Sequence, residues 1–200
     1  MKFDFFLGAR DTRVENEAKA LGFDRVYFIK EVSAVADIKK DGDYDGILIK
    51  TNAVEIMRRV IDKASNFCKI ILVLGVNDSI NRAALEHKKT YGLVSPEFER
   101  DFDYTHYRNS GLNQVLCKIA RDNGKKVMIN FEDLLMKDKK ERAILFGRII
   151  QNIGLCRKYK ASLKIGNFSS GAHEMRSASE LGAFCRAIGM TPAESNNSLS

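Results

Sequence analysis

The sequence is poor in the residues on which metal centres and membrane anchors depend. It has no tryptophan, three histidines and two prolines among 200 residues. His87, His106 and His173 lie in three separate segments, which disfavours a histidine-based metal site. No apolar run approaches the roughly 20 residues that cross a bilayer. Asp4 also interrupts the apolar start that a signal peptide would need, so we expect a cytoplasmic globular protein.

The spacing of the cysteines suits neither a disulfide framework nor a zinc site. The four of them stand far apart in the sequence, without a C-x-x-C spacing: Cys68, Cys117, Cys156 and Cys185. Zinc sites and disulfide-rich domains use closer, paired spacings. Cys117 and Cys156 fall at or beside the apolar stripes of predicted helices, where a free thiol behaves as a small hydrophobe. We therefore expect free, mostly structural thiols in a reducing compartment.

Short apolar runs alternate with helical patterns from one end of the chain to the other. The runs predict strands at Phe3–Leu7, Arg25–Lys30, Gly46–Lys50, Lys69–Leu74, Tyr91–Val94, Lys126–Phe131 and Ser162–Ile165. The periodic segments predict helices at Val14–Leu21, Val54–Ala64, Ser79–His87, Leu112–Asn123, Lys139–Tyr159 and Ala178–Ile188. Strands separated by helices favour a parallel sheet with right-handed crossovers.

An open doubly wound sheet and a closed barrel both satisfy this alternation. No G-x-G-x-x-G follows any predicted strand, so the dinucleotide-binding version of the open sheet lacks its phosphate-binding turn. The length suits one domain, or one of the smallest (β/α) barrels. We predict a single barrel domain over residues 1–190 and a polar, flexible tail over residues 191–200, which read TPAESNNSLS.

Residues 107–131 are the most informative segment and read YRNSGLNQVLCKIARDNGKKVMINF. Asn109 or Ser110 can accept hydrogen bonds from the N–H groups that open a helix. Apolar residues then recur at helical spacing, and Asn123-Gly124 supplies the left-handed turn that ends many helices. Residues 127–131 follow as an apolar run, which suits a strand buried on both faces.

A second segment, residues 169–176, reads SSGAHEMR. Ser169, Ser170 and Gly171 can present hydroxyl and backbone N–H donors to an anion near a helix start. Arg176 can add a bidentate contact to a phosphate. The alternative is an ordinary helix cap followed by a surface arginine.

These segments resemble the ribonuclease P protein component 3 family, and residues 91–131 and 163–190 carry most of the likeness. The opening Phe6–Ala18 looks similar but is less diagnostic, and between Asn52 and Asp78 only the strand–helix pattern matches. The resemblance implies a distorted or incomplete TIM-type barrel of about seven parallel strands, related to the polymerase-and-histidinol-phosphatase barrels. It implies a non-catalytic protein subunit that assists an RNA in removing the 5′ leader of precursor tRNA. Magnesium would then be held by the partner RNA, with no cofactor bound by the protein and another small protein subunit as a second partner.

The distribution of charge supports a polyanionic partner. The formal net charge is +7, yet residues 1–110 hold 18 basic and 18 acidic residues. Residues 137–164 hold nine basic residues and two acidic ones. Such a concentrated basic excess is typical of nucleic-acid binding, although a solubilising helix surface is the alternative. The predicted RNA contacts are Arg10, Arg13, Lys30, Lys50, Lys139, Lys140, Arg142, Lys164, Ser169, Ser170 and Arg176.

The loop over residues 96–107, PEFERDFDYTHY, is both acidic and aromatic. Its acidic residues disfavour contact with RNA phosphates, whereas aromatic side chains framed by charge are typical of protein interfaces. We predict a protein-binding site at Phe98, Phe102, Tyr104 and Tyr107.

A metal-dependent phosphoesterase on the same barrel is the alternative function. The phosphatase barrels carry a His-x-His pair at the end of the first strand, where this chain reads Leu7-Gly8-Ala9-Arg10. A guanidinium beside a divalent metal is unfavourable by Coulomb repulsion. Asp101, Asp103 and His106 form the only close cluster, and we favour a solvated loop over a metal site as its explanation. We predict no metal and no catalytic residue, and a phosphate-binding barrel for a small molecule is a third possibility.

Overall fold

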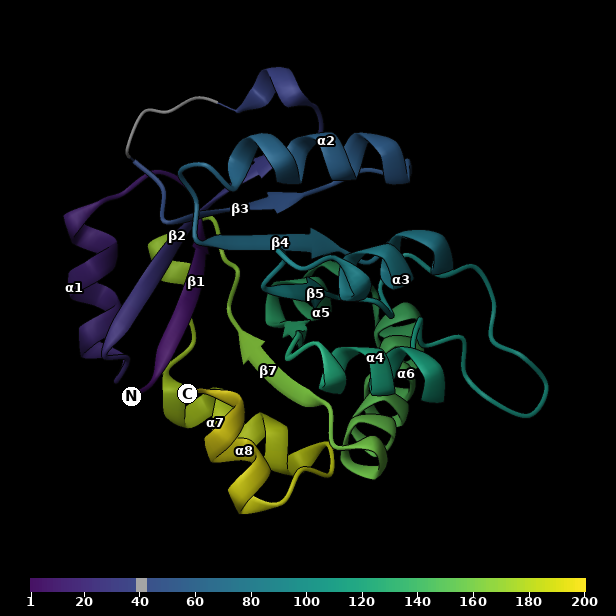
Figure 1. The fold of residues 1–200 in the computed structure, drawn as a ribbon. Coiled ribbons are helices and arrows are strands. Elements are labelled where there is room, and N and C mark those ends of the chain that lie inside the picture. Colours follow the sequence, from purple (N-terminus) through teal and green to yellow (C-terminus); the bar gives the residue numbers. More distant parts are fainter. Residues whose placement is uncertain (39–42) are drawn as a thin grey trace.

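Seven parallel strands form one sheet in chain order in the computed structural model, which describes residues 1–38 and 43–200 (Figure 1). The strands are β1 Phe3–Leu7, β2 Arg25–Val32, β3 Gly46–Ile49, β4 Ile70–Leu74, β5 Gly92–Val94, β6 Lys126–Asn130 and β7 Ser162–Gly166. All the predicted strands are confirmed, with ends that differ by up to two residues. The sheet curls into a nearly closed TIM-type barrel, as predicted.

Helices follow most strands and cover the outside of the sheet. They are α1 Thr12–Ala20, α2 Val54–Ala64, α3 Asp78–Glu86, α4 Gln114–Asp122, α5 Phe131–Met136, α6 Lys139–Tyr159, α7 Ala178–Ala187 and α8 Pro192–Ser198. Two short 3-10 helices are η1 Val35–Asp37 and η2 Ala172–Glu174. Within residues 1–38 and 43–200, every helix is too short or too polar to span a bilayer.

The core has an inner and an outer layer because the strands are buried on both faces. Inside the barrel lie Phe5, Ile29, Leu48, Leu72, Leu74, Val94, Met128 and Phe168. Alternate strand residues, such as Ile47 and Ile71, point outward and pack against α2 and α3. A second outer group packs β1, β2 and β6 against α1, α6 and α7. Strands with nonpolar residues on both faces are typical of parallel sheets.

The gap between β1 and β7 is closed by a short set of contacts. The Phe168 N–H donates to the Phe5 carbonyl at 2.9 Å, and the Leu7 N–H donates to the Ser169 carbonyl at 2.9 Å. The buried Asp4 carboxylate accepts from the backbone N–H and the side-chain Nδ2 of Asn167, at 2.7 and 2.6 Å. The rings of Phe5 and Phe168 stack with centroids 5.0 Å apart. A strand pair too short to be a full ladder thus completes the barrel.

The predicted flexible tail over residues 191–200 is instead an ordered helix in this structure. Thr191 and Glu194 cap α8 reciprocally, and Pro192 occupies its first turn. Ser195 and Ser198 are buried, and Leu199 packs into the outer core. The Phe3 N–H donates to the Leu199 carbonyl at 2.9 Å, so the two ends of the described chain lie side by side (Figure 1). The tail was predicted to be flexible because it is polar, but its polar side chains serve as helix caps and buried hydrogen-bond partners.

Two further details of the helices differ from the prediction. The cap of α4 is Asn113, whose Oδ1 accepts from the N–H groups of Val115 and Leu116, rather than Asn109 or Ser110. Helix α5 follows β6 without a linker because Asn130 ends the strand and caps the helix. The turn at Gly124 is confirmed, with a φ of +65°, and Cys117, Cys156 and Cys185 are buried thiols outside any disulfide.

The closure of the barrel gives a pH-dependent prediction. Burial raises the pKa of Asp4 to about 6, although hydrogen bonds from Asn167 oppose the rise. A carboxyl whose folded pKa lies above its ordinary 3.8 loses stabilisation as the pH rises through the folded pKa. In Asn167→Ala the ionised carboxylate has no compensating donor. We expect the free energy of unfolding to fall by about 3 kcal/mol at pH 8 and by about 1 kcal/mol at pH 5.

Urea unfolding of wild type and variant at the two pH values measures this difference. Asn66→Ala is the matched control because Asn66 is exposed on the loop after α2. An equal loss of stability at pH 5 and pH 8 would show that the Asp4 carboxylate does not depend on Asn167.

Candidate functional site

A cleft of about 910 Å³ opens at the mouth of the barrel, on the face formed by the carboxyl ends of the strands. Its floor consists of inward-facing apolar side chains, including Ile29, Leu48, Leu74 and Phe168. Its walls come from the loops after β1, β2, β3, β4 and β7, from the start of the loop after β5, and from α5. This is the face at which (β/α) barrels place their binding sites.

The cations predicted for the rim of this mouth are mostly paired with carboxylates. Arg10 bonds to Glu15 at 3.0 Å and to Asp45 at 2.8 Å. Arg13 bonds to Asp11 at 2.8 Å, and Lys50 bonds to Glu31. Lys30 lies over the Tyr44 ring, 5.0 Å from its centroid. The RNA role of these residues stays a prediction, and their charge is largely offset within the protein.

Among the described residues, the mouth of the barrel is lined by more acidic than basic side chains. Five carboxylates line the cleft, namely those of Glu31, Glu99, Glu132, Asp133 and Glu174, against the two lysines Lys30 and Lys50. Burial raises the pKa of Asp133 to about 6, although the Ser95 hydroxyl bonds to it at 2.5 Å. Burial also raises the pKa of Glu132, and the nearby Glu174 carboxylate adds to that rise. Spacing in sequence did not reveal this group because its members come from four separate segments.

The predicted anion cradle at residues 169–171 is not formed. Ser169 is fully buried on the strand that closes the barrel, and its Oγ has no hydrogen-bond partner among the described residues. The Gly171 N–H is already bonded to the Glu174 carboxylate at 2.9 Å. Ser170 is exposed at the cleft. Arg176 is held by its backbone, since its N–H donates to Asn167 Oδ1 at 2.8 Å.

Two other predicted RNA contacts, Lys164 and Arg142, are bonded to backbone carbonyls of the protein. Lys164 is 9% exposed, and its ammonium donates to the carbonyl of Asn197 at 2.6 Å, in α8, and to that of Ser200. Arg142 donates to the carbonyls of Leu134 and Lys137, at 2.7 and 2.8 Å, and so satisfies the end of α5. Both cations are therefore largely unavailable to an external phosphate.

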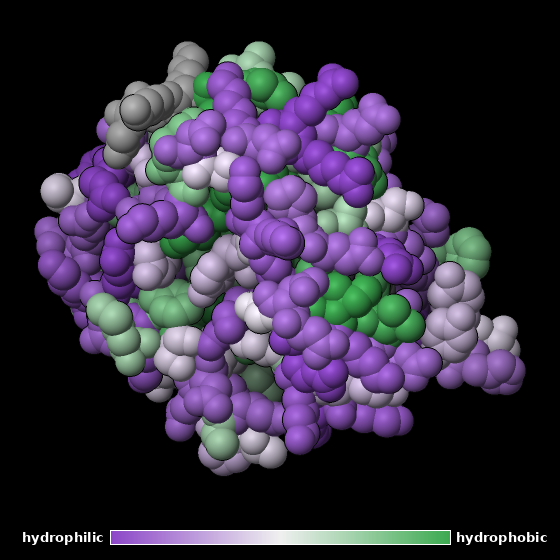
Figure 2. Space-filling model, viewed as in Figure 1, coloured by the Kyte–Doolittle hydropathy of each residue, from purple (hydrophilic) through white to green (hydrophobic). Residues whose placement is uncertain are grey.

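The last two predicted RNA contacts and several neighbouring basic residues lie on α6 and beside it. Lys139 and Lys140 are exposed in the first turn of α6 and form no ion pair within residues 1–38 and 43–200. At the other end of α6, the ammonium groups of Lys158 and Lys118 lie 5.6 and 5.8 Å from the centroid of the Tyr159 ring. Lys160 follows, exposed. Hydrophilic side chains cover most of the face shown in Figure 2.

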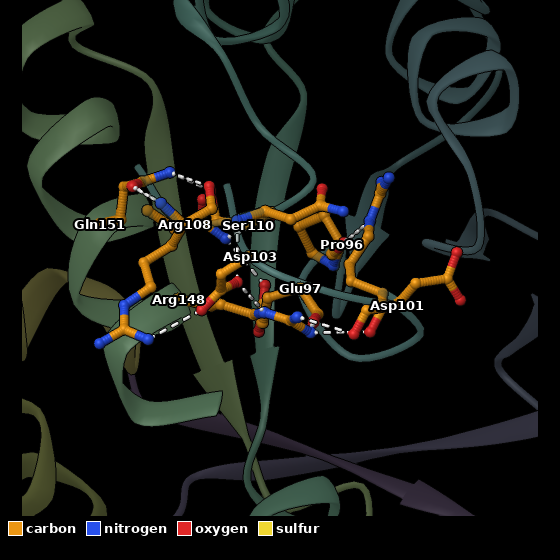
Figure 3. Close-up of polar contacts among 11 residues, drawn as sticks. Pro96, Glu97, Asp101, Asp103, Arg108, Ser110, Arg148 and Gln151 are labelled. Carbon is orange, nitrogen blue, oxygen red and sulfur yellow. Dashed lines mark hydrogen bonds and ion pairs between the residues drawn. The ribbon is translucent and has the colours of Figure 1, made fainter. Parts of the chain in front are cut away.

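A buried polar cluster on α6 fixes the loop between β5 and α4 (Figure 3). The Arg148 guanidinium bonds to the Asp103 carboxylate at 2.8 Å and to the carbonyls of Glu97 and Arg100 at 3.3 and 3.1 Å. Arg108 bonds to the other Asp103 oxygen at 2.8 Å. Although burial opposes the effect, these two arginines lower the pKa of Asp103. The central part of the loop is thus tied to a helix that follows it by more than thirty residues.

Neighbouring side chains of α6 complete the attachment. Gln151 accepts from the Arg108 N–H at 2.9 Å and donates to the Arg108 carbonyl at 2.8 Å. Asn152 donates to the Glu97 carboxyl at 2.9 Å and to the Ser110 carbonyl at 3.0 Å. Burial raises the pKa of Glu97 to about 8, so this group is mostly neutral at pH 7. The acidic loop therefore shows solvent fewer negative charges than its sequence contains.

Three of the four predicted interface aromatics project from this loop. Phe102, Tyr104 and Tyr107 are 71%, 47% and 60% exposed, and the two tyrosine rings lie 4.6 Å apart by centroid. Phe98 differs, because it is half-buried against the outer core under the Lys137 ammonium. Exposed aromatics on a fixed loop are typical of a binding surface. We call Phe102, Tyr104 and Tyr107 the aromatic surface.

Sequence reasoning missed the anchor of this loop. Arg148 and Asn152 interrupt the apolar stripe of Leu145, Ile149 and Ile153. This interruption was the only sign in the sequence that the buried face of the helix holds a polar partner. Polar residues at core positions of a helix require buried partners. The partners lie more than forty residues earlier in the chain, and no local pattern names them.

The fold defines a protein of the TIM-type barrel class. The family model described as RNase P subunit p30 matches residues 16–200, and the chain belongs to this family.

Two curated relatives illustrate the similarity. The ribonuclease P protein component 3 of Methanocaldococcus jannaschii is 32% identical over 161 residues, which cover 80% of this chain and 66% of the relative. That of Methanosarcina acetivorans is 31% identical over 144 residues, covering 72% and 57%. The chain thus spans less than two thirds of the length of these relatives.

Solved structures agree on the fold. A chain of a cryo-EM structure of archaeal ribonuclease P with mature tRNA superposes with a TM-score of 0.79 at 23% identity, over 98% of this chain and 86% of that one. An Arabidopsis N6-mAMP deaminase superposes with a TM-score of 0.57 at 12% identity, over 88% and 52%. At these identities the likeness concerns the fold alone.

The polar cluster gives a second prediction. Arg148→Met leaves Asp103 and several carbonyls without their buried partner, so we expect a loss of about 3 kcal/mol in the free energy of unfolding. Amide hydrogen exchange over residues 97–110 should become much faster, because α6 no longer holds the loop. Arg121→Met is the control, since Arg121 pairs only with the neighbouring Asp122 on the surface. Unchanged exchange in the Arg148 variant would contradict the anchoring role.

Proposed function

We propose that the protein is a subunit of ribonuclease P that assists a catalytic RNA in the endonucleolytic removal of the 5′ leader of precursor tRNA. The family match over residues 16–200 is the observation that carries the proposal. The relatives named ribonuclease P protein component 3 support it. We place this role in the cytoplasm.

RNA binding fits the exposed lysines of α6 better than the mouth of the barrel. Lys139 and Lys140 at one end, and Lys158 and Lys160 at the other, have no carboxylate partner among the described residues. The helix is 21 residues long, so its ends are about 30 Å apart. Flexible ammonium groups along such a length neutralise phosphates without reading base sequence.

The chemical step is assigned to the RNA partner rather than to this chain. Among residues 1–38 and 43–200 there is no group of three histidine, cysteine, aspartate or glutamate side chains placed to hold a metal ion. The magnesium ions that activate water and stabilise the leaving group would then belong to the RNA. In this assignment the protein has no catalytic residue.

A second protein subunit is the partner proposed for the aromatic surface. Its rings are fixed by the polar cluster before binding, which lowers the entropy lost on association. The exposed carboxylates Glu99 and Asp101 border it and disfavour RNA. Phe98, being half-buried, supports the loop from behind.

The RNA-binding proposal is tested by charge reversal on α6. Lys139→Glu with Lys140→Glu should reduce the slope of log affinity against log salt by about 1.5, because two phosphate contacts are lost. Binding of ribonuclease P RNA over a salt series measures the slope, and reconstituted cleavage of precursor tRNA at limiting protein should decrease in parallel. Lys19→Glu with Lys88→Glu, exposed on α1 and after α3, is the control of equal charge change. Identical slopes for the two double variants would reject α6 as the RNA surface.

The docking proposal is tested separately. Phe102→Ser with Tyr107→Ser should weaken binding to one of the separately purified small protein subunits of ribonuclease P by about a hundredfold, a loss of about 2.7 kcal/mol. Calorimetric titration of each subunit with the full chain gives the affinity. Ile56→Ser, an exposed apolar position on α2, is the control. If every subunit binds the variant as tightly as wild type, the aromatic surface is not the docking site.

A further inference from the structure

The cleft at the mouth of the barrel carries more carboxylates than ammonium groups among the described residues. A protein with a formal net charge of +7 here presents five carboxylates and two lysines, within the described residues. One of those lysines, Lys50, is already paired with Glu31. Phosphate would be repelled at this opening, and a cationic ligand would be attracted.

Several of these carboxylates are poorly neutralised. Glu99 and Glu132 form no ion pair within residues 1–38 and 43–200, although Arg176 lies within electrostatic range of Glu132. Glu174 is bonded to the Gly171 N–H and lies 4.0 Å from the His173 ring nitrogen. Like charges also lie near one another. In addition to burial, the nearby carboxylates of Glu132 and Glu99 raise the pKa of Asp133. A cation placed among these groups would relieve their repulsion.

The accessible apolar side chains of the cleft suit an aliphatic stem. Leu7 and Val76 are partly exposed in it, whereas Ile29, Leu48 and Phe168 beneath them are buried. Met136 stands at its edge with 74% of its surface exposed. A lysine or arginine side chain matches both the apolar and the acidic parts of the cleft, since its methylene groups prefer apolar contact and its charged end prefers a carboxylate. The volume of about 910 Å³ is near the upper end of the range for ligand sites and exceeds that of one such side chain.

The spacing of the carboxylates points to an extended ligand. They come from the end of β2, the loop after β5, the start of α5 and η2. No three of them, or of the histidines and cysteines, are close enough to hold a metal ion in the part of the chain that the structure describes. A ligand that meets several of them must therefore carry several separated positive charges.

We propose that the cleft at the mouth of the barrel binds a polypeptide segment of a partner protein that presents lysine or arginine side chains. The segment lays one or two aliphatic stems against Leu7, Val76 and Met136, and its charged ends pair with Glu132, Glu174 and Glu99. This site is distinct from the lysines of α6 and from the aromatic surface. It does not depend on the proposed role in ribonuclease P.

Calorimetric titration of the full chain with the peptide acetyl-(Leu-Lys-Ala-Arg)₃-amide tests the proposal. Wild type should bind the peptide, and Glu132→Gln with Glu174→Gln should weaken binding by about tenfold, or about 1.4 kcal/mol. Glu17→Gln with Glu55→Gln, exposed on α1 and α2, removes the same charge outside the cleft and should leave the affinity unchanged. The four substituted carboxylates are outside the core, so thermal unfolding should show folded protein in both variants.

Four results would overturn the proposal. The first is failure of the peptide to bind wild type. The second is equal weakening in the two double variants, which would indicate general charge attraction. The third is stoichiometric binding of Mn²⁺ alone to wild type and its loss in the cleft variant, which would indicate a metal site. The fourth is loss of RNA binding in the cleft variant. RNA binding by α6 is measured independently, so it can succeed or fail without deciding the peptide result.

Discussion

The double hydrogen bond between Asp4 and Asn167 is the contact on which the rest of the barrel depends. Seven strands leave a gap that no full ladder fills, and here one carboxylate bridges the first strand to the turn after the last. Gly166 permits the approach, because a Cβ there would lie 3.0 Å from the Phe5 ring and 3.2 Å from the Asp4 carboxylate. Closure places the loops after β1 and β7 beside each other, and so creates the mouth and its cleft.

In the folded chain, several charged side chains that the sequence suggests are available are paired within the protein. Arg10, Arg13 and Lys50 meet carboxylates from nearby loops, while Arg142 and Lys164 meet backbone carbonyls at helix ends. Exposed ion pairs of this kind contribute little to stability, yet they cancel the local field that a phosphate would sense. Exposed lysines without a carboxylate partner among the described residues remain on α6, and carboxylates outnumber lysines in the cleft. The two surfaces therefore suit ligands of opposite charge.

Helix α6 joins two roles through its two faces. Its outward lysines are exposed, while Arg148, Gln151 and Asn152 hold the loop that carries the aromatic surface. The contacts that Arg148 and Arg108 make with the Asp103 carboxylate are charge-assisted, which makes them strong and directional, although Asn152 Oδ1 has no hydrogen-bond partner among the described residues. The rigidity of the loop is thus a property of the helix, although the loop itself is polar and irregular in sequence.

The sequence by itself determined the alternation of strands and helices, the family and the excess of basic residues, because apolar periodicity, short motifs and composition are local properties. It did not predict the ordered α8 or the anchor of the aromatic surface, since a polar residue does not reveal whether it meets water or a buried partner. Ser169 and Lys164 read as ligand contacts, and burial made them structural. Only the tertiary structure decided which charges cancel and that Glu99, Glu132 and Glu174 share one cleft. The reason is physical: electrostatic interaction depends on distance in space, and closing the barrel brings together segments that are far apart in the chain.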